Sequence, residues 1–297
     1  MTREFKTYSE LDFTDDFMFC KIMTSNPELC RELLELILEM KIRRIAYPEA
    51  QKEIRHTYDG RGVRLDVYAE DDENNVYNIE MQTTLRPDLG KRIRYYQGMI
   101  DLNLIRSGER YRDLKKTYII FICKDDPFGR NLPVYHFRSI CREDRTLELK
   151  DETDKIIINA CGSREGLSAD MAAFLDYVRD SEVSSGLTEK LQEQVDRNRN
   201  REDWRVEFMT WEMELRDLRD EMREEMREEM REEMREEMRE EMREEMREEM
   251  REEYEGILTK KLAEKDSEIA DKDSAIADKD AIIASLKAQL AQAKAMQ

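Results

Sequence analysis

The sequence has few of the residues that build disulfide frameworks and imidazole metal sites. Its five cysteines are odd in number and widely spaced, and they form no Cys-x-x-Cys pair. This pattern argues against a zinc site or a disulfide scaffold and favours reduced thiols. Histidine is rarer still, because only His56 and His136 are present. Two histidines are too few for most imidazole-based metal sites.

Long apolar runs are also missing. No stretch of about 18 apolar residues occurs, so the sequence predicts no membrane-spanning helix. The N-terminus lacks the basic-then-apolar pattern of a secretion signal. We therefore expect a cytoplasmic protein that does not contact a membrane.

The chain has no net positive charge, because 70 acidic residues outnumber 51 basic ones and give a net charge of −19, which at first argues against a protein that binds nucleic acid. The charge is unevenly distributed. Eight consecutive Met-Arg-Glu-Glu tetrads at residues 222–253 carry 8 Arg and 16 Glu. Between Arg86 and Lys116, nine basic residues stand against four acidic ones. Much of the acidic excess therefore lies in the tail, and the middle of the chain is locally basic.

The most informative stretch is a predicted β-hairpin formed by residues 63–69 and 76–82. Both runs are rich in Val, Ile, Leu and Tyr, and the link between them is made of Asp, Glu and Asn. Side chains alternate along a strand, so Glu80 and Gln82 point the same way, and a centred turn places Asp66 opposite Glu80. The opposite face is then expected to carry Leu65, Val67, Ile79 and Met81.

Two carboxylates on one patch repel each other unless a proton or a cation lies between them. Oxygen ligands of this kind suit Mg²⁺ or Mn²⁺, which take one or two carboxylates together with water and phosphate oxygens. A metal ion held there could activate water and stabilise a phosphodiester under attack. The spacing alone is a weak motif, because a solvated hairpin whose acids face water has the same pattern.

The remaining periodicities predict helices on both sides of a mixed sheet, and therefore an α/β fold. Residues 117–123 form a short apolar run, which is typical of a strand buried on both faces. The other predicted elements are helices at 9–45, 87–105 and 168–183 and strands at 51–58, 134–137, 146–149 and 155–159.

The C-terminal third is expected to be helical. Residues 187–220 carry Trp204, Phe208 and Trp211 on one stripe, which is typical of packing against the globular body. In the tetrad repeat, a four-residue period advances about 40° per repeat, so its methionine stripe winds around the helix. Such a stripe cannot keep one seam facing a partner. We expect a long solvated helix there.

Beyond Gly256 the pattern changes to heptads. The apolar positions spaced by seven are Leu262, Ile269, Ile276, Ile283 and Leu290. Lysines interrupt the second core position, so the predicted coiled coil is weak. We expect a homo-oligomer that forms through the C-terminal helix. The expected divisions are a globular domain at 1–185, an amphipathic helical arm at 186–221, the tetrad helix at 222–253 and the coiled coil at 254–297.

The order of these features resembles the PD-(D/E)xK nuclease superfamily. A helical region is followed by a strand with Asp66, a strand with Glu80-Met81-Gln82 and a basic helix. More narrowly, residues 14–21 (Thr-Asp-Asp-Phe-Met-Phe-Cys-Lys) and 200–205 (Asn-Arg-Glu-Asp-Trp-Arg) are similar to the bacterial recombination-promoting nucleases, also described as PD-(D/E)xK nuclease family transposases. The resemblance covers roughly residues 8 to 215.

This resemblance implies a restriction-endonuclease-like domain and a metal-dependent DNA endonuclease linked to recombination or mobile elements. Asp66 and Glu80 would bind Mg²⁺, or Mn²⁺, with DNA as the partner. Gln82 stands where the superfamily usually has lysine; it can orient water, but it carries no charge. Asp16 would be the assisting acid from an early helix, with Glu53 as its rival. Asp16 as a helix cap or ion-pair partner is an equally good interpretation.

Three basic residues, Arg86, Lys91 and Arg94, would hold the DNA backbone without reading sequence. The alternative function is a catalytically weak or inactive nucleic-acid-binding or scaffold protein that oligomerises through its C-terminal helix. A strand-joining transposase ranks below simple hydrolysis, because no third acid stands out for strand transfer.

Overall fold

The computed structural model describes residues 6–54, 62–106 and 108–295. These residues divide into two units, with the boundary between Glu212 and Met213. His56 and the second half of the strand expected at 51–58 lie outside the described residues. Within the described residues, no helix is both long and apolar enough to cross a membrane.

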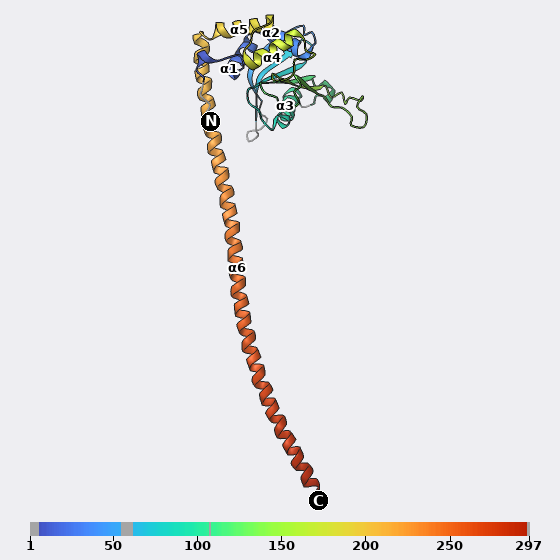
Figure 1. The fold of residues 1–297 in the computed structure, drawn as a ribbon, viewed down its shortest axis with the longest axis vertical. Coiled ribbons are helices and arrows are strands. Elements are labelled where there is room, and N and C mark those ends of the chain that lie inside the picture. The colour runs from blue at the N-terminus through green and yellow to red at the C-terminus, as the bar shows by residue number, and fades with distance from the viewer. Residues whose placement is uncertain (1–5, 55–61, 107, 296–297) are drawn as a thin grey trace. The chain divides into compact units, whose positions relative to one another are not determined.

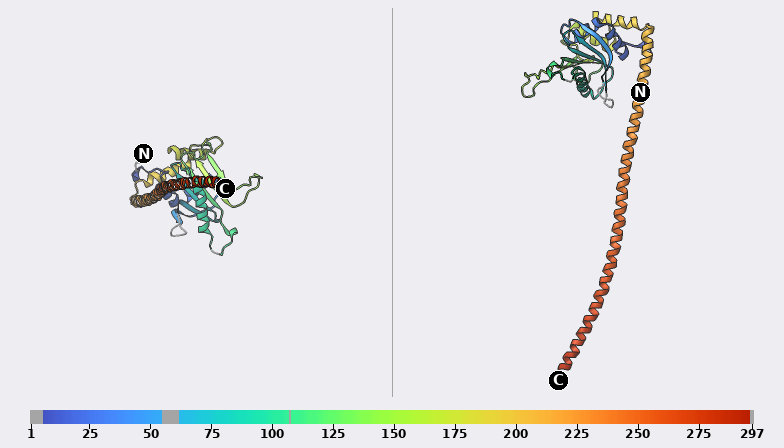
Figure 2. Two further views of the ribbon diagram at one scale, coloured as in Figure 1. Left: turned by 90° about the horizontal axis from the view of Figure 1, so that it is seen from below. Right: turned by 180° about the vertical axis from the view of Figure 1, so that it is seen from behind.

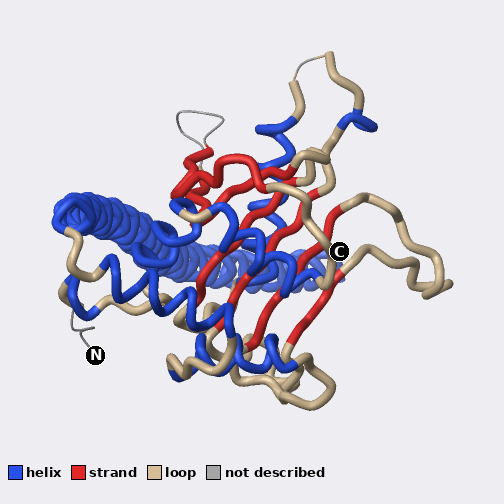
Figure 3. The backbone as a smooth tube through the Cα atoms, turned by 90° about the horizontal axis from the view of Figure 1, so that it is seen from above, coloured by secondary structure: helices blue, strands red, loops and turns tan. Residues whose placement is uncertain are grey.

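The first unit is built on a mixed β-sheet, which has six strands in the described part of the chain, in the order β1-β2-β3-β4-β6-β5 (Figure 3). The bounds are β1 Ile45–Ile54, β2 Val63–Asp71, β3 Val76–Gln82, β4 Thr117–Cys123, β5 Val134–Phe137 and β6 Thr153–Asn159. The first three strands form an antiparallel meander, β3, β4 and β6 run parallel, and β5 returns antiparallel at one edge.

Helices cover both faces of this sheet (Figure 1). The helical bounds in this unit are η1 Tyr8–Glu10, α1 Asp16–Ser25, α2 Pro27–Leu38, α3 Leu89–Leu104, η2 Tyr111–Asp113, α4 Ala169–Asp180 and α5 Gly186–Asn198. The larger apolar core joins α1, α2, α4 and α5 to one sheet face, and the smaller core joins α3 to the other. The predicted α/β class, a mixed sheet flanked by helices, is confirmed.

Strand β4 lies in the middle of the sheet, between β3 and β6, and all seven of its residues are buried. Its apolar run predicted this position correctly, because a strand with neighbours on both sides and helices on both faces meets no water. The connection from β3 to β4 passes through α3, which packs against the sheet face formed by β1 and β4.

Two local expectations were wrong. The strand expected at 146–149 does not form; this stretch makes one isolated bridge, Ile140 to Glu148, in a loop between β5 and β6. Leu147 is 57% exposed and Leu149 71% exposed, because none of the described strands or helices covers them. The helix expected at 187–220 is interrupted after α5, and a second helix, α6, begins at Glu202.

The first turns of α6 (Glu202–Ala295) pack their aromatic stripe on the globular body, as expected. Trp204 and Phe208 are buried, and Trp211 packs against the same core. The Phe208 ring lies 5.3 Å from the Phe17 ring and 5.8 Å from the Tyr8 ring, measured between centroids. The aromatic residues therefore bind α6 to the N-terminal helices.

The second unit consists of the remainder of α6, which is helical without a break to Ala295 (Figure 2). The tetrad methionines from Met222 to Met250 are exposed by 50 to 66%. Leu262, Ile269, Ile276 and Ile283 of the heptads are exposed by 47 to 56%.

Candidate active site

Strands β2 and β3 bring Asp66 and Glu80 together through a pair of crossed hydrogen bonds. The backbone N–H of Asp66 donates to Glu80 Oε1 at 3.1 Å, and the backbone N–H of Met81 donates to Asp66 Oδ2 at 3.0 Å. Each carboxylate thus binds a backbone N–H of the other strand. The register that continues from Val67 opposite Ile79 places the two acids across from each other.

The strand alternation is irregular at this point, and one sequence expectation was wrong there. Val67, Ile79 and Met81 pack in the larger core, as expected, but Leu65 packs in the smaller core beneath α3. Residues two apart on a regular strand share a face. Because Leu65 and Val67 do not, β2 changes face around Asp66, where carboxylates take the place of ladder carbonyls.

The two carboxyl groups are poorly solvated and repel each other. Burial raises the pKa of Asp66 to about 7, and the negative charge of Asp16 adds to this effect. Burial and the charge of Asp66 raise the pKa of Glu80, whose side chain is almost fully buried. Neither carboxylate forms an ion pair within the described part of the chain. Two adjacent acids are therefore held together, and within the described residues no cation is bound directly to either of them.

Gln82 lies at the end of β3 on the same strand face as Glu80, with both ends of its amide engaged. Its Oε1 accepts a hydrogen bond from Arg92 Nη1 at 2.9 Å, and its Nε2 donates to the carbonyl of Met81 at 2.9 Å. The amide is thus fixed in orientation by its own strand and by α3.

Arg92 is a site residue that the sequence interpretation missed. Besides Gln82, it donates to the hydroxyl of Tyr96 at 3.1 Å, and its guanidinium lies 5.5 Å from the Tyr96 ring and 5.6 Å from the Phe121 ring. Its positive charge lowers the pKa of both Asp66 and Glu80, against the larger effect of burial. The spacing offered a signal, because Arg92 follows buried Leu89 by three residues and precedes Tyr96 by four, on the inward helix face.

The early acid nearest the pair is Asp16, at the start of α1. Its charge is the strongest neighbouring charge acting on Asp66. One turn later, the fully buried Cys20 lies close to the same acids, and burial raises the pKa of its thiol well above the ordinary value. Glu53 is exposed on β1, opposite Arg64. The structure thus brings Asp16, but not Glu53, into the electrostatic neighbourhood of Asp66.

The three predicted DNA contacts are all exposed. Arg86 lines a small hollow together with Gln82, Leu89 and Cys123, at the carboxyl ends of β3 and β4. Lys91 and Arg94 are exposed on α3, on either side of the inward-facing Arg92. All three side chains are therefore accessible to a ligand, whereas Arg92 points inward and binds Gln82 and Tyr96.

The donor set fits a hydrated divalent cation. The fully buried Asn78 lies two residues before Glu80 on the same face of β3, and its amide lowers the pKa of Glu80 against the larger effect of burial. Within the described residues, no group of three or more His, Cys, Asp or Glu side chains is arranged so that it could hold a metal ion by itself. Mg²⁺ needs only one or two carboxylates, which this pair supplies.

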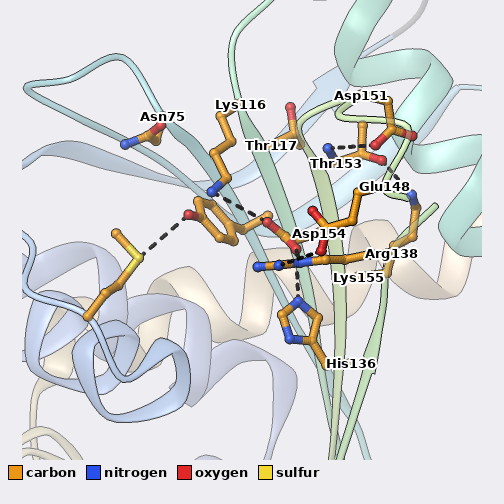
Figure 4. Close-up of polar contacts among 12 residues, drawn as sticks. Asn75, Lys116, Thr117, His136, Arg138, Glu148, Asp151, Thr153, Asp154 and Lys155 are labelled. Carbon is orange, nitrogen blue, oxygen red and sulfur yellow. Dashed lines mark hydrogen bonds and ion pairs between the residues drawn. The ribbon is translucent and has the colours of Figure 1, made fainter. Parts of the chain in front are cut away.

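A second polar cluster on the same sheet has a different character (Figure 4). Asp154, at the start of β6, accepts hydrogen bonds from Arg138 Nε at 2.6 Å and pairs with His136 Nε2 at 2.8 Å, and Lys116 Nζ lies 3.6 Å away. These partners lower the pKa of Asp154, although burial opposes them. A hollow of about 240 Å³ adjoins the cluster. Its ion pairs connect β5, β6 and the start of β4, which indicates a structural role.

Comparison with known proteins agrees with this geometry. The family model described as PD-(D/E)XK nuclease family transposase matches residues 13–160, which include α1, the β2–β3 hairpin, α3 and the parallel strands. No curated protein and no solved structure matches the chain. Nucleases of this family generally use divalent metals, and the family implies a DNA substrate. Residues 13–160 of the chain therefore match the PD-(D/E)XK nuclease family transposases.

Proposed function

We propose that the protein is a metal-dependent DNA endonuclease that hydrolyses phosphodiester bonds in recombination or in the movement of genetic elements. The observation that carries this proposal is the buried pair of Asp66 and Glu80, which the fold holds together without an ion-pair partner in the described residues. An uncompensated buried charge destabilises the fold, and a bound cation removes this cost by neutralising the two carboxylates. A soluble, cytoplasmic enzyme that acts on intracellular DNA accords with this function.

In this proposal, Asp66 and Glu80 hold Mg²⁺ or Mn²⁺, and Asp16 assists from the start of α1. The bound ion supplies positive charge to a phosphodiester under attack and acidifies water. Gln82 and Arg92 act together in the site. Because Arg92 fixes the Gln82 amide and is itself cationic, it provides from α3 a positive charge of the kind that the superfamily's lysine carries on β3.

The exposed residues Arg86, Lys91 and Arg94 would bind phosphates on either side of the scissile bond. Such contacts position the backbone and make binding depend on salt, without giving sequence preference. This local basic surface operates in a chain with a net charge of −19.

The experiment that tests this function is plasmid cleavage by the full-length protein. Supercoiled DNA is incubated with Mg²⁺, with Mn²⁺ or with EDTA, and nicked and linear products are measured. We expect cleavage with either ion and none with EDTA. Asp66→Ala should abolish cleavage without lowering the melting temperature, because it relieves charge repulsion. The matched control is Glu73→Ala, an exposed acid in the turn of the same hairpin, which should cleave like wild type.

Equal cleavage by wild type and Asp66→Ala would remove the proposed site. Binding of DNA without cleavage under any ion would instead favour a catalytically weak or inactive nucleic-acid-binding or scaffold protein. One specific observation supports this second candidate: the Gln82 amide stands in place of an ammonium group, and both of its polar ends are already engaged.

We also propose that the chain forms a homo-oligomer through residues 254–297, which follow the nuclease-like domain at 1–185, the arm at 186–221 and the tetrad helix at 222–253. The support is the row of half-exposed heptad residues Leu262, Ile269, Ile276 and Ile283 on α6. Light scattering on the full chain should give a multiple of 35.6 kDa. Ile276→Lys should yield monomers, whereas Met238→Lys in the tetrad repeat should not. A monomeric wild type would contradict the proposal.

A further inference from the structure

A short basic loop at residues 108–116 joins α3 to β4, away from the carboxylate pair; we name it the Tyr111 loop. It contains four basic and two acidic residues in a chain that is strongly acidic overall. Thr117, which follows it, pairs with Val76 at the start of β3. Because Glu80 lies four residues further along that strand, the loop base is about 13 Å along the strand from the proposed site.

The tip of this loop presents an aromatic side chain to solvent. Tyr111 is 87% exposed, the highest value among the large hydrophobic side chains in the described part of the chain. Burial of the ring therefore contributes almost nothing to folding. A single exposed aromatic residue needs no explanation by itself, but this one stands between Arg110 and Arg112, whose side chains are 65% and 69% exposed.

The loop is ordered by its own acidic residues. Asp113 accepts hydrogen bonds from the backbone N–H and the Nε of Arg110, at 3.3 and 3.2 Å, and Glu109 accepts the backbone N–H of Arg106 at 2.7 Å. The η2 turn closes with Asp113 N–H donating to the carbonyl of Arg110 at 2.8 Å. Both acids thus hold the backbone turn that displays the ring, so little conformational entropy remains to be lost when the ring binds.

We propose that the Tyr111 loop is a binding site for single-stranded nucleic acid, in which the Tyr111 ring stacks on an unpaired base and Arg110 and Arg112 contact the adjoining phosphates. The proposal rests on the proposed function and specifies its substrate as nucleic acid with an unpaired segment near the scissile bond.

The occupant follows from chemistry and charge. Alternating positive charge and aromatic surface matches a single strand, in which phosphates alternate with exposed base faces. Bases in an intact duplex are already stacked on one another, so a surface ring gains a partner only where a base is unpaired. An acidic peptide would satisfy the arginines but offers no flat face to the ring.

The test is fluorescence anisotropy with the full-length protein in EDTA, using labelled single-stranded DNA, single-stranded RNA and duplex DNA of one sequence. We expect Tyr111→Ala to weaken single-strand binding roughly fivefold or more and to leave duplex binding nearly unchanged. Tyr111→Phe, which keeps the ring, should bind like wild type. Tyr254→Ala removes a tyrosine that is 69% exposed in the acidic tail and should have no effect. The DNA and RNA arms identify which strand the loop prefers.

Three results would overturn the inference: unchanged single-strand affinity in Tyr111→Ala, equal losses for single strand and duplex, or a loss in Tyr111→Phe as large as in Tyr111→Ala. Competition by polyglutamate as effective as by unlabelled oligonucleotide would also overturn it, because charge alone would then explain binding. Plasmid cleavage separates the two proposals. If the wild type cleaves plasmid DNA but Tyr111→Ala binds single strands as tightly as the wild type does, only the loop proposal is refuted. If the wild type does not cleave DNA, the proposed function fails, and the effect of Tyr111→Ala on single-strand binding can still be measured in EDTA.

Discussion

Two buried acidic centres lie on the same sheet and are treated in opposite ways. Asp154 has a cation or a hydrogen-bond donor on several sides, contributed by Lys116, His136 and Arg138, and its pKa is lowered. Asp66 and Glu80 lie beside each other, and the nearby Arg92 is bound to Gln82 rather than to either acid. The pKa values of both acids are raised.

The difference separates stability from function. A buried carboxylate with its cations in place is complete and stabilises the elements that it joins. A buried pair without them costs folding free energy and persists where a ligand supplies the missing charge. The two centres differ in the cations and hydrogen-bond donors that surround their carboxylates.

The strongest test of this comparison exchanges one acid in each centre for its amide. Glu80→Gln should lower DNA cleavage by roughly two to three orders of magnitude or more, the range seen when one electrostatic group of a catalytic site is removed. It should not reduce stability, because a repelled charge is removed. Asp154→Asn should leave cleavage intact and lower the free energy of unfolding by about 1–3 kcal/mol. Plasmid cleavage measures the activity of each variant, and urea denaturation measures its stability. If Asp154→Asn lost cleavage and Glu80→Gln lost stability instead, Asp154 would be the functional acid and Glu80 the structural one.

Divalent ions should stabilise one centre only. At an ion concentration about 100 times its dissociation constant, the wild type should gain about 2.7 kcal/mol of unfolding free energy. Asp154→Asn should gain as much, and Asp66→Asn should gain almost nothing. Thermal unfolding with and without Mn²⁺ measures this gain. A similar gain in Asp66→Asn would place the ion elsewhere.

The two centres should also respond oppositely to pH in the metal-free protein. The pKa of Asp66 is about 7 in the fold against 3.8 in the unfolded chain, so between these values the folded state binds more protons. Stability should therefore fall as pH rises through this window, by up to about 1.4 kcal/mol per pH unit. Asp154 has a lowered pKa, so its contribution is lost only on acidification. Urea denaturation at several pH values should show a shallower slope in Asp66→Asn, in which burial still raises the pKa of Glu80 and stability still falls with pH for that reason.

The smallest expected effect concerns the cation beside the pair. Arg92→Lys keeps the charge but loses the fork that holds Gln82 and Tyr96 together, so cleavage should fall about tenfold. Lys91→Ala, on the exposed side of α3, should weaken DNA binding and reduce its salt dependence without a change in the maximal rate. Steady-state kinetics separate these outcomes. If both variants lower the maximal rate equally, Arg92 does not have a role in the active site that Lys91 lacks.

Much of the architecture could be predicted because it depends on periodicity. The run at 117–123 indicated a central strand, and the aromatic stripe of Trp204 and Phe208 indicated a docked helix. The strand expected at 146–149 failed because its alternation is local, whereas a strand also needs a neighbour. Leu65 failed for a related reason, because β2 departs from regular alternation at Asp66.

The sequence by itself determined which acids could meet, because the hairpin spacing sets Asp66 opposite Glu80 whatever surrounds them. Only the tertiary structure decided that the pair is buried, that Arg92 reaches Gln82 from α3, and that Asp16 rather than Glu53 acts on Asp66. The physical reason is range. Strand pairing is fixed by neighbours in the chain, whereas desolvation and charge depend on every element packed around a group.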